Sequence, residues 1–95
     1  MSYSLRFKEE AKKDWDRLDP AIREQFAKKL RERRENPWVD SARLCDLPNC
    51  YKIKLRSAGY RLVYEVRDQE VVIVVIAVGK QERHAVYKAA AKRRE

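Results

Sequence analysis

The first residues of the chain show two successive hydrophobic periods. Apolar side chains first alternate with polar ones, which is the period of a half-buried strand: Tyr3, Leu5 and Phe7. They then recur four, four and three positions apart, which places them on one face of a helix: Phe7, Ala11, Trp15 and Leu18. The pattern therefore predicts a strand that runs directly into a helix.

A second helix is bounded by two prolines. Asp19-Pro20 is a typical helix start, a capping carboxylate followed by proline at the first helical position. Asn36-Pro37 ends the helix, because the residue before a proline is pushed out of helical space. Most other positions are charged, and the apolar stripe consists of Ile22, Phe26 and Leu30. The two stripes predict a helical hairpin packed on one face of a sheet.

The second half of the chain has the period of strands. After a loop at 38–49, three strands joined by tight connections are predicted at 51–56, 60–66 and 71–78. The last of them is apolar on both faces, as in a central strand that is covered on each side. A final helix at 82–94 has a mostly alanine stripe, which buries little surface and docks weakly. We expect one α+β domain over residues 1–95, ordered β-α-α-β-β-β-α, with a sheet rich in antiparallel pairs.

The composition restricts the class of protein. The 95 residues include 23 Lys+Arg and 15 Asp+Glu, a net charge of +8 that favours a polyanionic partner such as nucleic acid or an acidic protein segment. The longest apolar run, at 71–78, is less than half of the roughly 20 residues that cross a bilayer, so no membrane partner is predicted. Since the first residues lack a secretory signal, we expect a cytoplasmic protein.

The cysteines and the histidine do not predict a metal site. Cys45 and Cys50 are five positions apart and match no metal or redox motif, so we expect reduced thiols. His84 is the only histidine, and zinc sites need more ligands than this set offers. The sequence predicts neither a metal nor another cofactor.

Cations gather on the predicted hairpin at 51–66. Lys52, Lys54 and Arg56 are two positions apart, so they project from the same face of their strand. With an even turn Arg56 pairs with Arg61, which then joins that face, whereas an odd turn flips Arg61 to the other side. Like charges on neighbouring strands repel, so the grouping favours an anion-binding face. The structural alternative is an edge strand that uses lysine to prevent aggregation.

Three further residues follow the central strand and can turn back over these cations: Lys80, Arg83 and Tyr87. A phosphodiester on this face would meet cations for its oxygens and a ring for a base. RNA carries its own nucleophile, the 2′-hydroxyl, so the protein need supply only a base, an acid and charge stabilisation. The neighbours of Lys54 are expected to lower its pKa by like-charge repulsion, which makes free amine available as the base.

Motifs along nearly the whole chain resemble the RelE family of bacterial toxin–antitoxin systems. They are YKIKLRSAGYRLVY at 51–64, VGK at 78–80, ER at 82–83 and VY at 86–87. The resemblance implies a ribosome-dependent endoribonuclease that cuts messenger RNA in the A site by 2′-hydroxyl attack and leaves a 2′,3′-cyclic phosphate and a 5′-hydroxyl. It implies Lys54 as general base, Lys52 and Arg61 as stabilisers of the phosphorane, and Tyr87 as a ring that stacks on the substrate.

The sequence departs from the family pattern at the general acid. The arginine that serves this role falls where this chain has Gln81, and an amide cannot donate a full proton. Either Arg83 stabilises the leaving oxygen electrostatically, or His84 acts as the acid, since the pKa of histidine is near neutral. The third alternative is reduced activity.

The resemblance also implies partners. A RelB-like antitoxin would wrap the toxin and displace the final helix, and the 70S ribosome with its mRNA would be the target. The free toxin is expected to be a monomer that forms a hetero-oligomer with the antitoxin. Arg56 and Lys80 are expected to bind RNA. The cations of the second helix are either a solvated face or a contact with ribosomal RNA: Lys28, Lys29, Arg31, Arg33 and Arg34.

Two other functions compete with this interpretation. A non-catalytic toxin like ParE would inhibit DNA gyrase by binding, but those relatives lack the paired lysines and the terminal tyrosine. A plain RNA-binding module would result if the change at Gln81 has ended catalysis. Cleavage of translated message would indicate the endoribonuclease, and inhibition of gyrase would indicate the ParE-like toxin. Binding of RNA without cuts would indicate the RNA-binding module.

Overall fold

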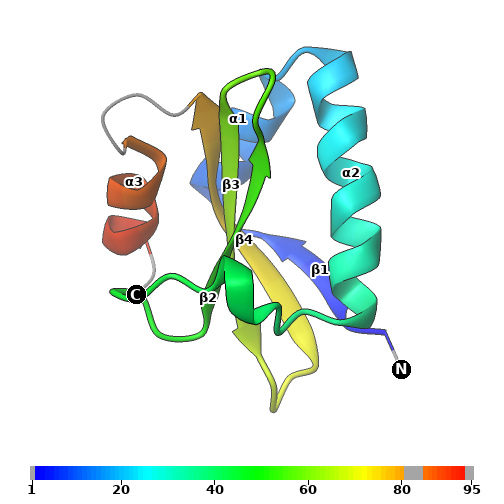
Figure 1. The fold of residues 1–95 in the computed structure, drawn as a ribbon, viewed down its shortest axis with the longest axis vertical. Helices are drawn as coiled ribbons and strands as arrows, with labels where there is room; N and C mark the ends of the chain where they lie inside the picture. Colours follow the sequence, from blue (N-terminus) through cyan, green and yellow to red (C-terminus); the bar gives the residue numbers. More distant parts are fainter. Residues whose placement is uncertain (1, 81–84, 94–95) are drawn as a thin grey trace.

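A four-stranded sheet in the order β1-β4-β3-β2 runs through the middle of the computed structural model, which describes residues 2–80 and 85–93 (Figure 1). The elements follow the chain as β1 (Ser4–Phe7), α1 (Glu9–Asp16), α2 (Pro20–Glu35), the short 3₁₀ helix η1 (Asp40–Ala42), β2 (Cys50–Leu55), β3 (Tyr60–Arg67), β4 (Val72–Lys80) and α3 (Ala85–Arg93). The predicted order of helices and strands is confirmed, and η1 lies in the segment predicted as a loop. Within the described ranges, no helix has the length and apolar character that crossing a membrane requires.

The pairing of the strands is mostly antiparallel, as predicted. β1 pairs in parallel with β4, whereas β4 with β3 and β3 with β2 form antiparallel pairs. A bulge interrupts the second pairing, because Val63 faces Ala77 while Tyr64 faces Val75. Ile76 is the extra residue, and it joins Ala77 in one buried cluster on one face of the sheet.

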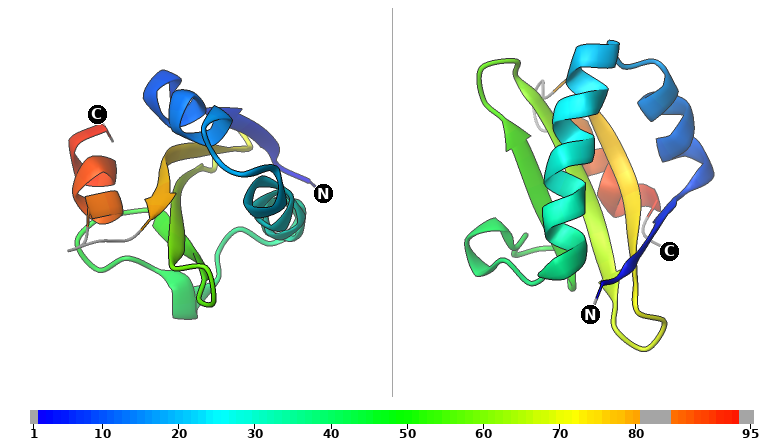
Figure 2. Two further views of the ribbon diagram at one scale, coloured as in Figure 1. Left: turned by 90° about the horizontal axis from the view of Figure 1, so that it is seen from above. Right: turned by 90° about the vertical axis from the view of Figure 1, so that its right-hand side faces the viewer.

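Helices cover both faces of the sheet. One buried cluster lies beneath α1 and α2 and includes Phe26, Tyr64 and Ile73. A second lies beneath α3 and includes Val63 and Val86. Figure 2 shows α2 and α3 on opposite sides of the strands. Residues 72–78 of β4 contribute to both clusters and are all buried, so the prediction of a central strand covered on each side is confirmed.

The ends of α2 lie where the prolines predicted them, but the expected cap is absent. The helix begins at Pro20 and ends at Glu35, with Asn36 as its C-cap. Asp19 occupies the N-cap position, yet its carboxylate makes no capping hydrogen bond. Its backbone carbonyl accepts the first helical bond from the Arg23 N–H. Proline's preset φ therefore starts this helix without side-chain capping.

α3 packs on the sheet through few apolar atoms, as its alanine-rich stripe predicts. Val86 and Ala90 are its buried residues. A second attachment, which the sequence pattern does not predict, is electrostatic. Arg93 Nη1 lies 3.0 Å from Asp14 Oδ2 on α1, and Arg93 Nε lies 3.4 Å from Glu10 Oε2. Arg93 thus ties the end of α3 to α1 across the domain.

Candidate active site

The register of the β2–β3 hairpin brings three cations to one face. Lys54 lies directly opposite Arg61, and Lys52 lies two residues before Lys54 on the same strand. Directly opposed residues of an antiparallel pair project from the same face, so these side chains share one side of the sheet. We call Lys52, Lys54 and Arg61 the cationic face. It lies on the α3 side, because Val63, the partner of Lys52, packs into the cluster beneath α3.

The expected pairing of Arg56 with Arg61 is wrong, although the expected face is right. β2 ends at Leu55, which pairs with Tyr60, so residues 56–59 form the turn. Gly59 has a φ of 71°, the left-handed conformation that favours glycine. Arg61 pairs with Lys54, which lies two positions before the expected partner Arg56. Because residues two positions apart on a strand point to the same face, Arg61 still joins the face of Lys52 and Lys54. Arg56 lies in the turn itself and is exposed.

A cavity of about 310 Å³ opens beside the cationic face at the edge of the sheet. Its lining consists of Arg33, Ser41, Ala42, Lys52, Lys54 and Arg56. Within residues 2–80 and 85–93, no carboxylate forms an ion pair with any of these four cations. The cavity is therefore an anion-binding environment whose positive charge the described part of the protein does not neutralise.

The cations around Lys54 change its protonation equilibrium. Repulsion from the charge of Lys52 lowers the pKa of Lys54 below its usual value, with smaller contributions from desolvation and from the charges of Arg56 and Arg61. A lysine with its normal pKa of about 10.4 is a poor base at neutral pH. The arrangement thus raises the fraction of free amine at Lys54, as the sequence predicted.

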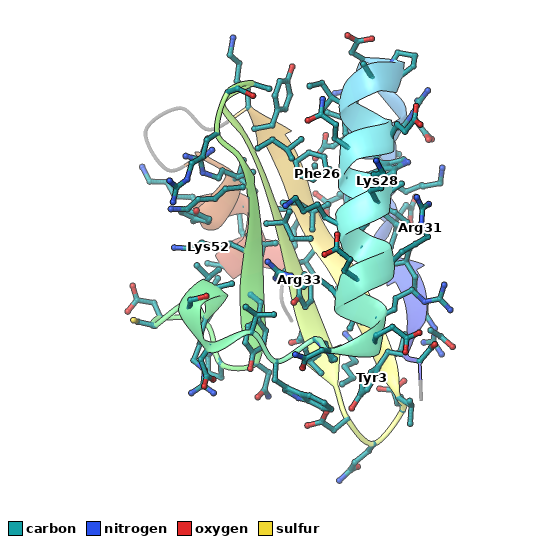
Figure 3. The ribbon with its side chains drawn as sticks, turned by 45° about the vertical axis from the view of Figure 1, so that its right-hand side comes forward. Tyr3, Phe26, Lys28, Arg31, Arg33 and Lys52 are labelled. Carbon is teal, nitrogen blue, oxygen red and sulfur yellow. The ribbon has the colours of Figure 1, made fainter. Side chains whose placement is uncertain are left out.

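Arg33 lines the cavity, whereas the sequence predicts for it either a solvated helix face or a contact with ribosomal RNA. It extends from the inner side of α2 toward the strands, whereas Lys28 and Arg31 lie on the outer side of the helix (Figure 3). Arg33 Nη1 donates to the Lys52 carbonyl at 3.1 Å and to the Tyr64 hydroxyl at 2.9 Å. Its guanidinium carbon lies 5.7 Å from the centre of the Tyr64 ring.

The spacing along α2 contained a signal for this position. Arg33 follows Phe26 and Leu30 at seven and three positions, which continues the apolar stripe of the helix. Arg34 is also partly buried, and its Nε donates to the Tyr3 carbonyl at 2.7 Å. Lys28, Lys29 and Arg31 are exposed, on a helix that covers the sheet face opposite to α3.

Tyr87 lies on the same side of the sheet as the cationic face but in a separate hollow. It is half-buried on α3 and packs against the cluster beneath that helix. It also lines a cavity of about 320 Å³ between α3 and the loop that contains Leu44 and Leu47. The lining of the cationic cavity includes neither Tyr87 nor Arg61. A substrate that contacts all of these residues must span both hollows.

Lys80 does not turn back over the cationic face as expected. It pairs with Tyr60, while the neighbouring Gly79 pairs with Arg61. Since successive residues of a strand point to opposite faces, Lys80 and Arg61 project from opposite faces of the sheet. The three residues considered for leaving-group chemistry lie outside the described residues: Gln81, Arg83 and His84.

The remaining aromatic and sulfur side chains have structural surroundings. Trp15 packs against Phe7 and Phe26, and Trp38 meets Tyr3 edge-on. Cys45 is exposed and Cys50 is buried, and neither is in a disulfide. Among the described residues, no group of three or more His, Cys, Asp and Glu side chains is arranged to hold a metal ion.

Comparison with known proteins gives the family. The family model "ParE toxin of type II toxin-antitoxin system, parDE" matches residues 5–85. The curated "mRNA interferase toxin RelE" of Escherichia coli strain K12 is 54% identical over 93 residues, which span 98% of each chain. The chain belongs to the RelE/ParE family of toxins. The "mRNA interferase RelE" of Shigella flexneri shows the same identity and coverage.

Solved structures of RelE share the fold of this family member. The isolated E. coli RelE toxin superposes with a TM-score of 0.83 at 52% identity, covering 99% of this chain and 100% of that one. RelE in the intact E. coli RelBE toxin–antitoxin complex gives a TM-score of 0.84 at 54% identity, covering 86% of this chain and 100% of that one. The α+β fold inferred from the sequence is thus the fold of RelE.

Proposed function

We propose that this chain is the toxin of a type II toxin–antitoxin system and that it inhibits translation by cutting messenger RNA on the ribosome. The observation that carries the proposal is the gathering of Lys52, Lys54 and Arg61 on one sheet face, beside a cavity whose described cations form no ion pair with a carboxylate. Such a face binds the phosphates of RNA, and the cations that lower the pKa of Lys54 also favour its action as a base there. Two relatives at 54% identity, both named as mRNA interferases, support the same activity.

In the proposed reaction the free amine of Lys54 takes the proton of a 2′-hydroxyl. The resulting oxygen attacks the adjacent phosphorus, and the bond from phosphorus to the 5′-oxygen of the next nucleotide breaks. Lys52 and Arg61 flank Lys54 and stabilise the negative charge of the phosphorane. Tyr87, from the second hollow on the same side of the sheet, stacks on a base and orients the strand. The products are a 2′,3′-cyclic phosphate and a 5′-hydroxyl.

The leaving 5′-oxygen needs a proton or a neighbouring positive charge. Gln81 supplies neither, so we assign electrostatic stabilisation to Arg83, with the proton of the 5′-hydroxyl taken from water, and His84 as the alternative acid. Comparing Arg83→Ala with His84→Ala decides between them. We expect Arg83→Ala to lose most of its cleavage rate while His84→Ala keeps it; the opposite pattern would make His84 the acid.

The proposed partners follow from the same function. The solved RelBE complex is that of a related toxin with its antitoxin, and we propose a RelB-like antitoxin for this chain. The exposed cations of α2 are available for ribosomal RNA: Lys28, Lys29 and Arg31. Because ribosomes and translated message are in the cytoplasm, we propose that the toxin acts there.

The function is tested with purified toxin, programmed ribosomes and mapping of the 5′ ends of the message. We expect cuts in phase with the codons that require both the ribosome and Lys54, with Lys54→Ala as the inactive control. Inhibition of DNA gyrase without cuts would instead support the ParE-like alternative. Ribosome binding without cuts would indicate a domain that has lost catalysis, and either result would overturn the proposal.

A further inference from the structure

We propose that the cavity beside the cationic face binds a second phosphodiester of the message, next to the one that is cut, and that Arg33 is its principal ligand. This inference rests on the proposed function and adds to it a binding subsite and a residue. The cavity and the cationic face share Lys52 and Lys54, so a strand held at the face continues into the cavity. Arg33 and Arg56 supply the additional positive charge there.

The contacts of Arg33 hold its guanidinium in a fixed place. One terminal nitrogen donates to the Lys52 carbonyl and to the Tyr64 hydroxyl, and the group lies against the ring of Tyr64. Tyr64 is itself fixed, because it is fully buried and its hydroxyl donates to the Pro37 carbonyl at 2.7 Å. A guanidinium has five N–H donors, so donors remain for an anion in the cavity. A donor fixed in advance loses little conformational freedom when it binds a phosphate.

A purely structural role for Arg33 does not explain its surroundings. A residue that only joins α2 to β2 could be neutral, and placing it beside Lys52, Lys54 and Arg56 adds repulsion. The exposed Ser41 of η1 completes the lining with a hydroxyl donor. Cations and a hydroxyl around an open cavity are the donor set that binds phosphate oxygens.

The test removes one charge from each side of the proposed contact. The protein variants are Arg33→Met and, as a control with the same net charge, Arg17→Met at an exposed position after α1. Arg33→Lys serves as a second variant that keeps the charge while removing the planar fork. The messages carry a single neutral methylphosphonate at each phosphate flanking the cut in turn. The readout is the ratio of cleavage rates on the charged and the neutral message for the same variant, so a loss of folded protein cancels.

At one flanking position, we expect the wild-type protein to cut the charged message on the order of tenfold faster than the neutral one. This ratio should fall close to one in Arg33→Met, take an intermediate value in Arg33→Lys and stay unchanged in Arg17→Met. An unchanged ratio in Arg33→Met would overturn the inference. If the ratio is unchanged and Arg33→Met also binds the antitoxin more weakly, the cavity is instead a site for an acidic protein segment, and the inference is likewise overturned.

A binding measurement keeps this inference separate from the proposed function. The probe is a 2′-O-methyl trinucleotide, which cannot be cut, titrated against the isolated protein at several salt concentrations. The plot of log K against log salt concentration falls with a negative slope, and loss of one phosphate contact makes this slope less steep by about 0.7 for a single strand. We expect this decrease in Arg33→Met and not in Arg17→Met. If the wild type cuts no message but the slope changes as expected, only the proposed function fails; if the wild type does not bind, or the slope does not change, the subsite fails.

Discussion

The attachment of α3 through Arg93 leads to a quantitative prediction. The helix carries Tyr87, yet only Val86 and Ala90 among its described residues are buried. The ion pairs to Asp14 and Glu10 should therefore supply much of the free energy that holds the helix on the domain. Replacing Arg93 by methionine keeps an apolar stem of similar length and removes the charge. We expect α3 to open more often in Arg93→Met while the sheet stays closed.

The geometry gives the size of the effect. The Arg93 side chain is 19% exposed and that of Asp14 is 30% exposed, with 3.0 Å between the paired atoms, so this is a partly buried, charge-assisted hydrogen bond. Such bonds contribute about 1.5–3 kcal/mol, and partial exposure places this one at the low end. Glu10 is 68% exposed and adds little. A loss of about 1.5 kcal/mol corresponds to opening on the order of tenfold more often.

Native-state hydrogen exchange measures this opening residue by residue. Amides in the second half of α3 should exchange on the order of tenfold faster in Arg93→Met, while amides of β3 and β4 keep their wild-type rates. Lys92→Met is the matched control, because Lys92 is exposed on the same turn and forms none of these pairs. Equal protection of α3 in Arg93→Met and the wild type would show that these ion pairs do not hold the helix. Equal acceleration of exchange in the whole sheet would show that α3 does not open separately from it.

Three further predictions concern the site and its support. Lys52→Met removes the largest cause of the lowered pKa of Lys54, so we expect that pKa to rise. The rising limb of the pH–rate profile should then move to higher pH, because the base must be deprotonated. A limb that does not move would exclude Lys54 as the base. Tyr64→Phe removes a buried hydroxyl bonded to Pro37 and Arg33 and should cost about 1–3 kcal/mol in the free energy of unfolding; unchanged thermal melting would contradict this. Cleavage should persist after the toxin is dialysed against EDTA and assayed on ribosomes in their normal magnesium buffer, and loss of activity that zinc restores would contradict a metal-independent reaction.

The periodicity of the chain was sufficient to predict the elements, because each helix or strand buries one face against the same sheet. The spacing of Phe26 and Leu30 located the inner face of α2, and the unbroken apolar run of β4 predicted burial on both sides. Short-range signals also gave the ends of α2, since proline restricts the backbone directly. They did not reveal that Asp19 leaves its carboxylate out of the cap, which depends on a single rotamer.

Features that depend on contacts between distant segments were beyond the sequence interpretation. The exact partner of Arg61 is decided by where the turn begins, and a shift of two residues changes the partner but not the face. The pairing of Arg93 with α1 joins segments that are far apart in sequence. The charge of Arg33 predicts an exposed position, because charged side chains are normally exposed, although its spacing continues the buried stripe of α2.

The nucleophile of the proposed reaction is the 2′-hydroxyl of the message, and one substitution in the message removes it. A ribosome-bound message with a single 2′-deoxynucleotide on the 5′ side of the cut lacks the attacking oxygen, while its phosphate charge and its codon are unchanged. We predict that the toxin cuts the all-ribose message and leaves the substituted one intact at that position. Cleavage of the deoxy message at the same place and rate would contradict the account.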